Sequence, residues 1–190
     1  LQRELFHRYP FGGNDGQRIN LTVGSVFGDP DKEIMFDSSG HGRIMVFNYY
    51  GLLMNNGYYP FGVNDKTGFS LAIGNVDGGE RGENILAFKN GNLAEVMIYD
   101  FRFAKMLKRF TVGVNVKDVL VASGDITGDG ADEIIVGLIY NDKTTVKTFN
   151  SNGVKLAEFS VANGLGGASS GLAALDVNYD GKKDIVFMSK

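Results

Sequence analysis

The feature of this sequence that most constrains its fold is an internal repeat of about fifty residues. Tyr9-Pro10-Phe11-Gly12 recurs unchanged as Tyr59-Pro60-Phe61-Gly62, fifty residues later. Apolar runs that end at the same spacing mark further copies: Val23-Gly24, Ile73-Gly74 and Ser123-Gly124, with a last copy at Ala174-Leu175-Asp176. A period of this length predicts an array of about three and a half similar supersecondary units.

Each unit has the pattern of short strands joined by tight turns. In the third copy, apolar and β-branched residues form four runs separated by Gly, Asn and Asp: 119–123, 133–140, 145–150 and 155–161. Asn-Gly turns, which favour the positive φ angles of hairpins, occur within 150–153 and 89–92. Four antiparallel strands in about fifty residues, repeated, predict an all-β chain that forms a β-propeller or part of one.

We expect one domain over residues 1–190, divided into units at about 1–16, 17–66, 67–117, 118–168 and 169–190, with the first and last units partial. Residues 1–11 align with the fourth strand of a unit, and 171–189 supply only the first two strands of another. Open sheet edges invite pairing, so we expect the remaining blades to come from a longer chain or a second copy. Alternatively, the N-terminal strand completes a shortened final blade.

Composition argues against several classes of function. The net charge of −3 and the scattered lysines and arginines argue against nucleic-acid binding. No stretch approaches the roughly 20 apolar residues of a membrane-spanning helix. The chain has no cysteine, its two histidines, His7 and His41, stand alone, and the serine-hydrolase-like run at 167–171 lacks a strand before it and a helix after it. We therefore predict no enzymatic activity.

Two loops carry oxygen-bearing side chains at alternate positions. A calcium ion takes about six to eight oxygen ligands, and a glycine bend lets a short acidic loop wrap around it. The predicted ligands of the first loop are Asp125, Thr127, Asp129, the carbonyl of Ala131, and Glu133. Those of the second loop are Asp176, Asn178, Asp180, the carbonyl of Lys182, and Asp184. The alternative interpretation is that Asp, Asn and Gly simply favour turns here.

The corresponding loops of the first two units are less regular. The loop of the second unit, 75–84, is interpreted as carrying one extra residue and an arginine, so Asn75, Asp77 and Glu83 are predicted as weaker ligands. In the first unit Phe27 stands where an oxygen is needed. We expect no ion there, with Lys32 supplying positive charge instead.

The stretch 122–137, which reads ASGDITGDGADEIIVG, resembles the FG-GAP and VCBS repeats of integrin alpha-subunit propellers and bacterial surface proteins, and 175–187 resembles a second instance. The resemblance implies a β-propeller with calcium between the first two strands of a blade, in a secreted or cell-surface protein. The sequence departs from the family at Phe27, at Thr127 and in the loop of the second unit, 75–84.

These observations lead to one hypothesis and two alternatives. The hypothesis is a non-enzymatic, calcium-stabilised, extracellular or cell-surface propeller module with a structural or adhesive role and a protein or glycan partner. The first alternative is a lectin-like propeller that presents loops such as 61–66 to a sugar; the second is the scaffold of a polysaccharide-active enzyme. Aromatic residues on third and fourth strands are predicted to fill gaps between blades.

Overall fold

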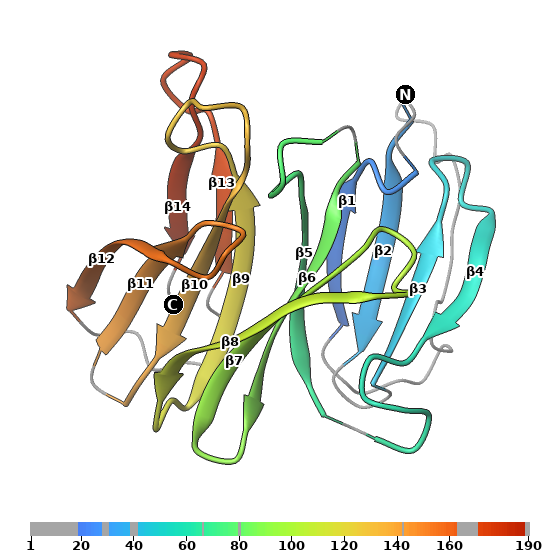
Figure 1. Cartoon of the computed structure of the whole chain (residues 1–190), viewed down its shortest axis with the longest axis horizontal. Helices are drawn as coiled ribbons and strands as arrows, with labels where there is room; N and C mark the ends of the chain where they lie inside the picture. Colours follow the sequence, from blue (N-terminus) through green and yellow to red (C-terminus); the bar gives the residue numbers. More distant parts are fainter. Residues whose placement is uncertain are drawn as a thin grey trace, which may run out of the picture.

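The computed structural model describes residues 19–27, 31–38, 42–65, 67–79, 81–141, 143–162 and 171–188. These residues form fourteen β-strands and no helix (Figure 1). No membrane-spanning helix is present in the described part of the chain. The predicted N-terminal strand at 1–11, both histidines and most of the serine-containing run at 167–171 lie outside the described residues.

Consecutive strands pair to form four antiparallel sheets (Figure 1). The first sheet contains β1 (Ile19–Gly24), β2 (Glu33–Ser38), β3 (Arg43–Phe47) and β4 (Leu53–Tyr58). The second contains β5 (Phe69–Gly74), β6 (Glu83–Asn90), β7 (Leu93–Tyr99) and β8 (Met106–Val114). The third contains β9 (Asp118–Gly124), β10 (Glu133–Ile139), β11 (Lys143–Phe149) and β12 (Lys155–Ala162), and the fourth contains β13 (Gly171–Leu175) and β14 (Asp184–Met188). The prediction of an all-β chain with four-stranded antiparallel sheets is confirmed.

Glycines form the hairpin turns that the sequence predicted. Gly91, between β6 and β7, has a φ of 61°, and Gly153, between β11 and β12, has a φ of 77°. These values lie in the left-handed region, where glycine has no Cβ to clash. The turn before β12 is closed by a hydrogen bond from Gly153 N–H to the carbonyl of Asn150.

The sheets pack face to face, and each neighbouring pair encloses an apolar core. Met35 and Ile44 of the first sheet pack with Leu86 of the second. Ile85 and Val121 lie in the core between the second and third sheets. The third and fourth sheets enclose a smaller cluster, which includes Ile135, Leu172 and Ile185. The middle sheets are therefore apolar on both faces, as strands sandwiched between other layers must be.

The first strands of the four sheets lie next to one another. Together β1, β5, β9 and β13 line a cavity of about 530 Å³. Several of the predicted gap-filling aromatic residues lie between sheets: the Phe61 ring is 4.7 Å from Phe88, and Phe110 is 5.4 Å from Phe149. Tyr50, by contrast, is 62% exposed.

Candidate metal-binding corners

The loop between the first and second strands of each sheet is called its corner, and the corners are numbered 1 to 4 with the sheets. Positions within a corner are counted from 1, the residue after the first strand, to 9, the residue that begins the second strand, as from Asp125 to Glu133 in corner 3. The same strand register precedes each corner, with the last residue of the first strand paired to the first residue of the second: Gly24 with Glu33, Gly74 with Glu83, Gly124 with Glu133, and Leu175 with Asp184. All four corners therefore have the same length. The prediction of an extra residue in corner 2 is wrong. Gly79 occupies the position in corner 2 that Asp129 occupies in corner 3, and no residue is inserted.

Corner 3 is organised around the Asp125 carboxylate. Its Oδ1 accepts hydrogen bonds from Gly128 N–H at 2.6 Å and Asp129 N–H at 3.2 Å, and its Oδ2 accepts one from Gly130 N–H at 2.9 Å. Asp129 Oδ1 accepts a further hydrogen bond from Ala131 N–H at 3.0 Å. Both carboxylates are thus fixed within the loop. Asp125 Oδ1 accepts two hydrogen bonds, whereas Asp125 Oδ2 and Asp129 Oδ1 accept one each and keep a second lone pair for a ligand.

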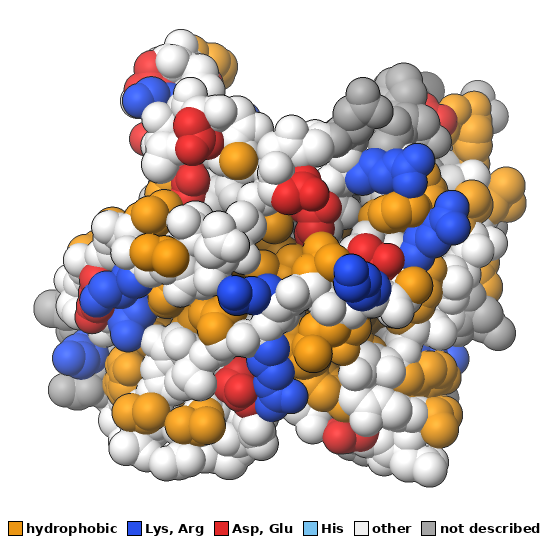
Figure 2. Space-filling view, in the orientation of Figure 1, with side chains coloured by type: hydrophobic (Ala, Val, Ile, Leu, Met, Phe, Trp, Pro, Cys, Tyr) orange, Lys and Arg blue, Asp and Glu red, His pale blue; other side chains and the backbone are white. Residues whose placement is uncertain are grey.

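Corner 4 shares three of these hydrogen bonds. Asp176 accepts from Asp180 N–H at 3.2 Å and from Gly181 N–H at 3.0 Å, and Asp180 Oδ1 accepts from Lys182 N–H at 2.9 Å. Asn178 Oδ1 accepts from Asp180 N–H at 2.9 Å, and its amide donates to Asp180 Oδ2. The two corners predicted as calcium sites therefore hold their position-1 and position-5 carboxylates alike. Acidic side chains gather on these projecting corners at the upper left of Figure 2.

The position-9 carboxylate has a structural role that sequence reasoning missed. In every corner it accepts a hydrogen bond from the backbone N–H of position 2: Val26 to Glu33, Val76 to Glu83, Ile126 to Glu133, and Val177 to Asp184. The distances run from 2.8 to 3.1 Å. The signal was visible in the sequence, because Glu33 recurs at this position even in the corner where no ion was expected.

Like charges crowd corners 2 and 3. Burial, and then the negative charges of Asp129 and Asp125, raise the pKa of Glu133. In corner 2, burial and then the charge of Asp77 raise the pKa of Glu83 to about 7. A bound cation would relieve both effects, because a nearby positive charge favours the ionised carboxylate.

Corner 2 also contains a polar atom without a partner. The Asn75 amide donates to the carbonyl of Gly79 at 2.6 Å, but its Oδ1 is buried and accepts no hydrogen bond within the described structure. A buried oxygen without a donor is costly unless a cation or water contacts it. Corner 2, predicted as the weaker site, therefore supplies one oxygen that suits a hard cation, beside Asp77 and Glu83.

A lysine from corner 4 lies against corner 3. A Cβ added to Gly128 would lie 2.8 Å from Cε of Lys182. Burial tends to raise the pKa of Asp125, but hydrogen bonds from Gly130, Gly128 and Asp129 N–H lower it, and the charge of Lys182 adds a smaller contribution in the same direction. The Lys182 side chain thus partly compensates the negative charge of corner 3. Across the described residues, no three His, Cys, Asp or Glu side chains converge into a ready-made metal site.

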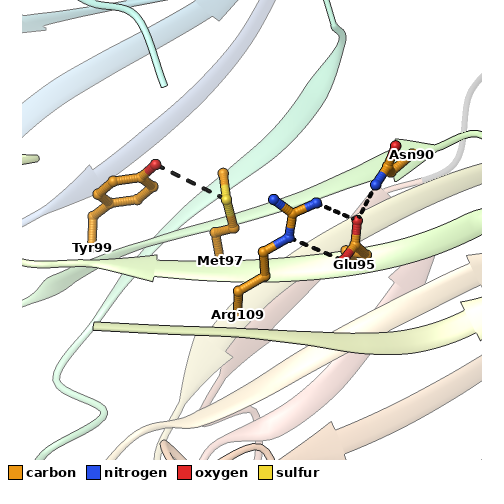
Figure 3. Close-up of polar contacts among 5 residues, drawn as sticks. All are labelled: Asn90, Glu95, Met97, Tyr99 and Arg109. Atoms are coloured by element: carbon orange, nitrogen blue, oxygen red, sulfur yellow. Dashed lines mark hydrogen bonds and ion pairs between the residues drawn. The ribbon is translucent and has the colours of Figure 1, made fainter. Parts of the chain in front are cut away.

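A second polar cluster lies on β7 and β8 of the second sheet (Figure 3). Arg109 donates from Nε to Glu95 Oε1 at 3.0 Å and from Nη2 to Glu95 Oε2 at 2.6 Å, and Asn90 donates to Glu95 Oε2 at 2.7 Å. The Arg109 hydrogen bond is the main cause that lowers the pKa of Glu95. Both oxygens of the Glu95 carboxylate are engaged, so the cluster links β6, β7 and β8.

The fold is similar to part of the fold of one group of enzymes. No family model and no curated protein matched the chain. Among solved structures, exotype rhamnogalacturonan lyase YesX superposes with a TM-score of 0.59 at 14% identity, over 92% of this chain. Rhamnogalacturonan lyase YesW and the Bacillus licheniformis rhamnogalacturonan lyase PL11 each give 0.57 at 16% identity, over 88% of this chain. The chain spans about 40% of the length of these structures.

Proposed function

We propose that the chain is a calcium-stabilised segment of a β-propeller that serves as scaffold in an extracellular, polysaccharide-active protein. The observation that carries this proposal is the shared architecture of the corners, which holds two carboxylates in the same positions in corners 3 and 4. The similarity to three rhamnogalacturonan lyases supports a polysaccharide context over the purely adhesive role expected from sequence.

The corner residues fit a calcium ion by chemistry. Corner 3 offers Asp125, Thr127, Asp129, Glu133 and the Ala131 carbonyl, all of which are oxygen donors, as Ca²⁺ prefers. Corner 4 offers Asp176, Asn178, Asp180, Asp184 and the Lys182 carbonyl. Bound calcium would neutralise the clustered carboxylates and contribute its binding free energy to folding.

The corners can stiffen the array because they touch one another. Asp132 N–H, in corner 3, donates to the carbonyl of Asn75 in corner 2 at 2.8 Å, and Lys183 N–H, in corner 4, donates to the carbonyl of Asp125 in corner 3 at 2.8 Å. Ordering one corner therefore fixes a backbone partner of the next corner. We propose this row of corners as the element through which calcium stabilises the sheets, with no catalytic group contributed by the chain itself.

Chelation tests the metal part of the proposal. The melting temperature in calcium should fall by several degrees when excess chelator is added, because a ligand that binds only the folded state stabilises it by mass action. Asp129→Asn and Asp180→Asn should each remove part of this difference. An identical melting temperature with and without chelator would contradict calcium binding.

Polysaccharide assays test the rest. The chain should bind rhamnogalacturonan without cleaving it. A neutral glucan serves as the control polymer. Turnover of rhamnogalacturonan by this chain alone would overturn the scaffold role, and absence of any binding would separate the chain from polysaccharide function.

A further inference from the structure

An aromatic pocket lies where the first and second sheets meet, on the side away from their first strands. Its volume is about 180 Å³, and its walls within the described structure are Tyr58, Tyr59, Pro60, Tyr99 and Phe103. The first sheet supplies the end of β4 and the residues after it, and the second sheet supplies the end of β7 and the turn that follows. None of these five residues belongs to a corner or lines the cavity of about 530 Å³. The pocket is therefore separate from both.

Three of the rings are held firmly in place, and one is accessible. The Tyr58 ring centroid lies 4.6 Å from that of Phe103, and the Tyr99 centroid lies 5.8 Å from that of Phe103. All three rings pack against the apolar core that the first two sheets enclose. Tyr59, by contrast, is 38% exposed. The pocket thus has a fixed aromatic floor beside an aromatic ring that solvent and ligands can reach.

The turn between β7 and β8 holds Phe103 in an unfavourable backbone conformation. Its φ is 55°, in the left-handed region that residues with a Cβ rarely adopt. The turn is fixed by Asp100, whose Oδ1 accepts hydrogen bonds from Ala104 N–H at 2.7 Å and Lys105 N–H at 3.1 Å. Phe103 N–H donates to the Asp100 carbonyl at 2.9 Å. Glycine would fit this φ without cost, so a strained phenylalanine here indicates a use for its ring.

The pocket also offers hydroxyl groups that can donate to a ligand. The Tyr99 hydroxyl donates to the Pro60 carbonyl at 3.4 Å and lies 4.0 Å from Met97 Sδ (Figure 3). The first contact is longer than the usual O–H···O distance of about 2.7–2.8 Å, and sulfur is a weak acceptor, so a ligand oxygen can take this proton. Burial raises the pKa of Tyr58 and of Tyr99, which keeps both hydroxyls protonated. Aromatic faces and hydrogen-bond donors thus lie side by side.

We propose that this aromatic pocket binds a single pyranose ring of a polysaccharide. The C–H groups on one face of a pyranose carry a small positive charge, which suits the negative face of an aromatic ring, and its hydroxyls suit the tyrosine hydroxyls. A volume of about 180 Å³ is below the about 300–1,000 Å³ of pockets for drug-sized ligands, so it admits one sugar ring and no peptide segment. The inference rests on the polysaccharide context proposed above and gives it a site.

Titration with free sugars tests the pocket directly. In proton NMR spectra, the ring resonances of Tyr59 and Phe103 should shift saturably with at least one of L-rhamnose, D-galactose and D-glucose in the millimolar range. Their loss in Tyr59→Ala and Phe103→Gly assigns these resonances, and glycine is chosen at 103 because it suits a φ of 55°. No shift with any of the three sugars overturns the inference, whether or not the chain binds rhamnogalacturonan. Shifts with a proline-rich peptide and with no sugar would indicate a protein partner and would also overturn it.

Binding of the polymer tests whether the pocket is used. In affinity electrophoresis with rhamnogalacturonan in the gel, Tyr59→Ala and Phe103→Gly should each weaken binding about tenfold, because each removes an aromatic face. Tyr59→Phe keeps the ring and should lose less. Tyr49→Ala, in the turn between β3 and β4 and with a similar exposure of 43%, is the matched control and should bind like wild type. Circular dichroism of each variant checks that it is folded.

The outcomes separate this inference from the proposed function. Equal binding of the polymer by wild type and all variants overturns the pocket as its site and leaves the proposed function standing. A wild-type chain that does not bind rhamnogalacturonan contradicts the proposed function, and the free-sugar titration then decides the inference by itself.

Discussion

Replacing Glu83 with glutamine should remove much of the pH dependence of stability in metal-free buffer. Glu83 is 6% exposed, and burial followed by repulsion from Asp77 raises its pKa from 4.5 to about 7. The folded state thus holds this proton more tightly than the unfolded state does. The resulting stabilisation is fully present below the unfolded pKa of 4.5 and is lost as the pH rises through about 7.

The size of the effect follows from the shift. One pKa unit corresponds to about 1.4 kcal/mol, so moving from 4.5 to about 7 makes the wild-type chain at most about 3 kcal/mol less stable across this range. Glutamine cannot ionise, and its carbonyl oxygen can still accept the 3.1 Å hydrogen bond from Val76 N–H. The Glu83→Gln variant should therefore be more stable than wild type above pH 7 and should show a flatter profile.

Urea unfolding at a series of pH values, with chelator present, measures this difference. Glu133 also has a raised pKa, so it makes stability fall with rising pH in the same direction as Glu83 does. The contribution of Glu83 is therefore the difference between the profiles of the variant and the wild type. Asp77→Asn removes only the second cause of the Glu83 shift and should flatten the profile less. Parallel profiles for wild type and Glu83→Gln would refute the reasoning.

Three further predictions concern the rest of the molecule. Arg109→Met should lower the free energy of unfolding by about 1 kcal/mol near neutral pH, since the arginine side chain is 41% exposed. Because the pKa of Glu95 is lowered in the folded state, this loss should disappear as the pH falls through the folded pKa of Glu95, as measured by urea titrations. Lys182→Gln should tighten calcium binding at corner 3 in calorimetric titrations, by removing a competing positive charge, and unchanged affinity would contradict that role. Ile135→Ala should lower the free energy of unfolding by about 2–5 kcal/mol through cavity formation, whereas Val186→Ala, at the equivalent but exposed position, should cost far less.

The strands were predictable because each obeys a local rule that repeats. Alternating and β-branched residues mark β9 to β12, and the Asn-Gly turns at Gly91 and Gly153 adopt the positive φ angles that hairpins require. The fifty-residue period then predicts the spacing of the four sheets that the described residues form. The turns predicted from the sequence join strands that are neighbours in the structure, so the sequence pattern is enough to predict the order of strands within each sheet.

The corners were less predictable, because a sequence does not show which way a carboxylate side chain points. The sequence predicts Glu133 as a calcium ligand, which stays a prediction, but it does not reveal that this carboxylate accepts hydrogen bonds from Ile126 and Thr127 N–H within its own corner. The sequence also predicted one extra residue in corner 2, which the structure does not have. The strand register, which pairs Gly74 with Glu83, is the physical constraint on loop length.

Calcium titration calorimetry on the chelator-treated chain tests the central claim most directly. The account predicts at least two ions bound per chain, from corners 3 and 4, with a weaker contribution from corner 2. The stoichiometry should fall by one in Asp129→Asn and by one in Asp180→Asn, while both variants remain folded. No heat of binding from the folded wild-type chain, at any calcium concentration up to the millimolar range, would contradict the account.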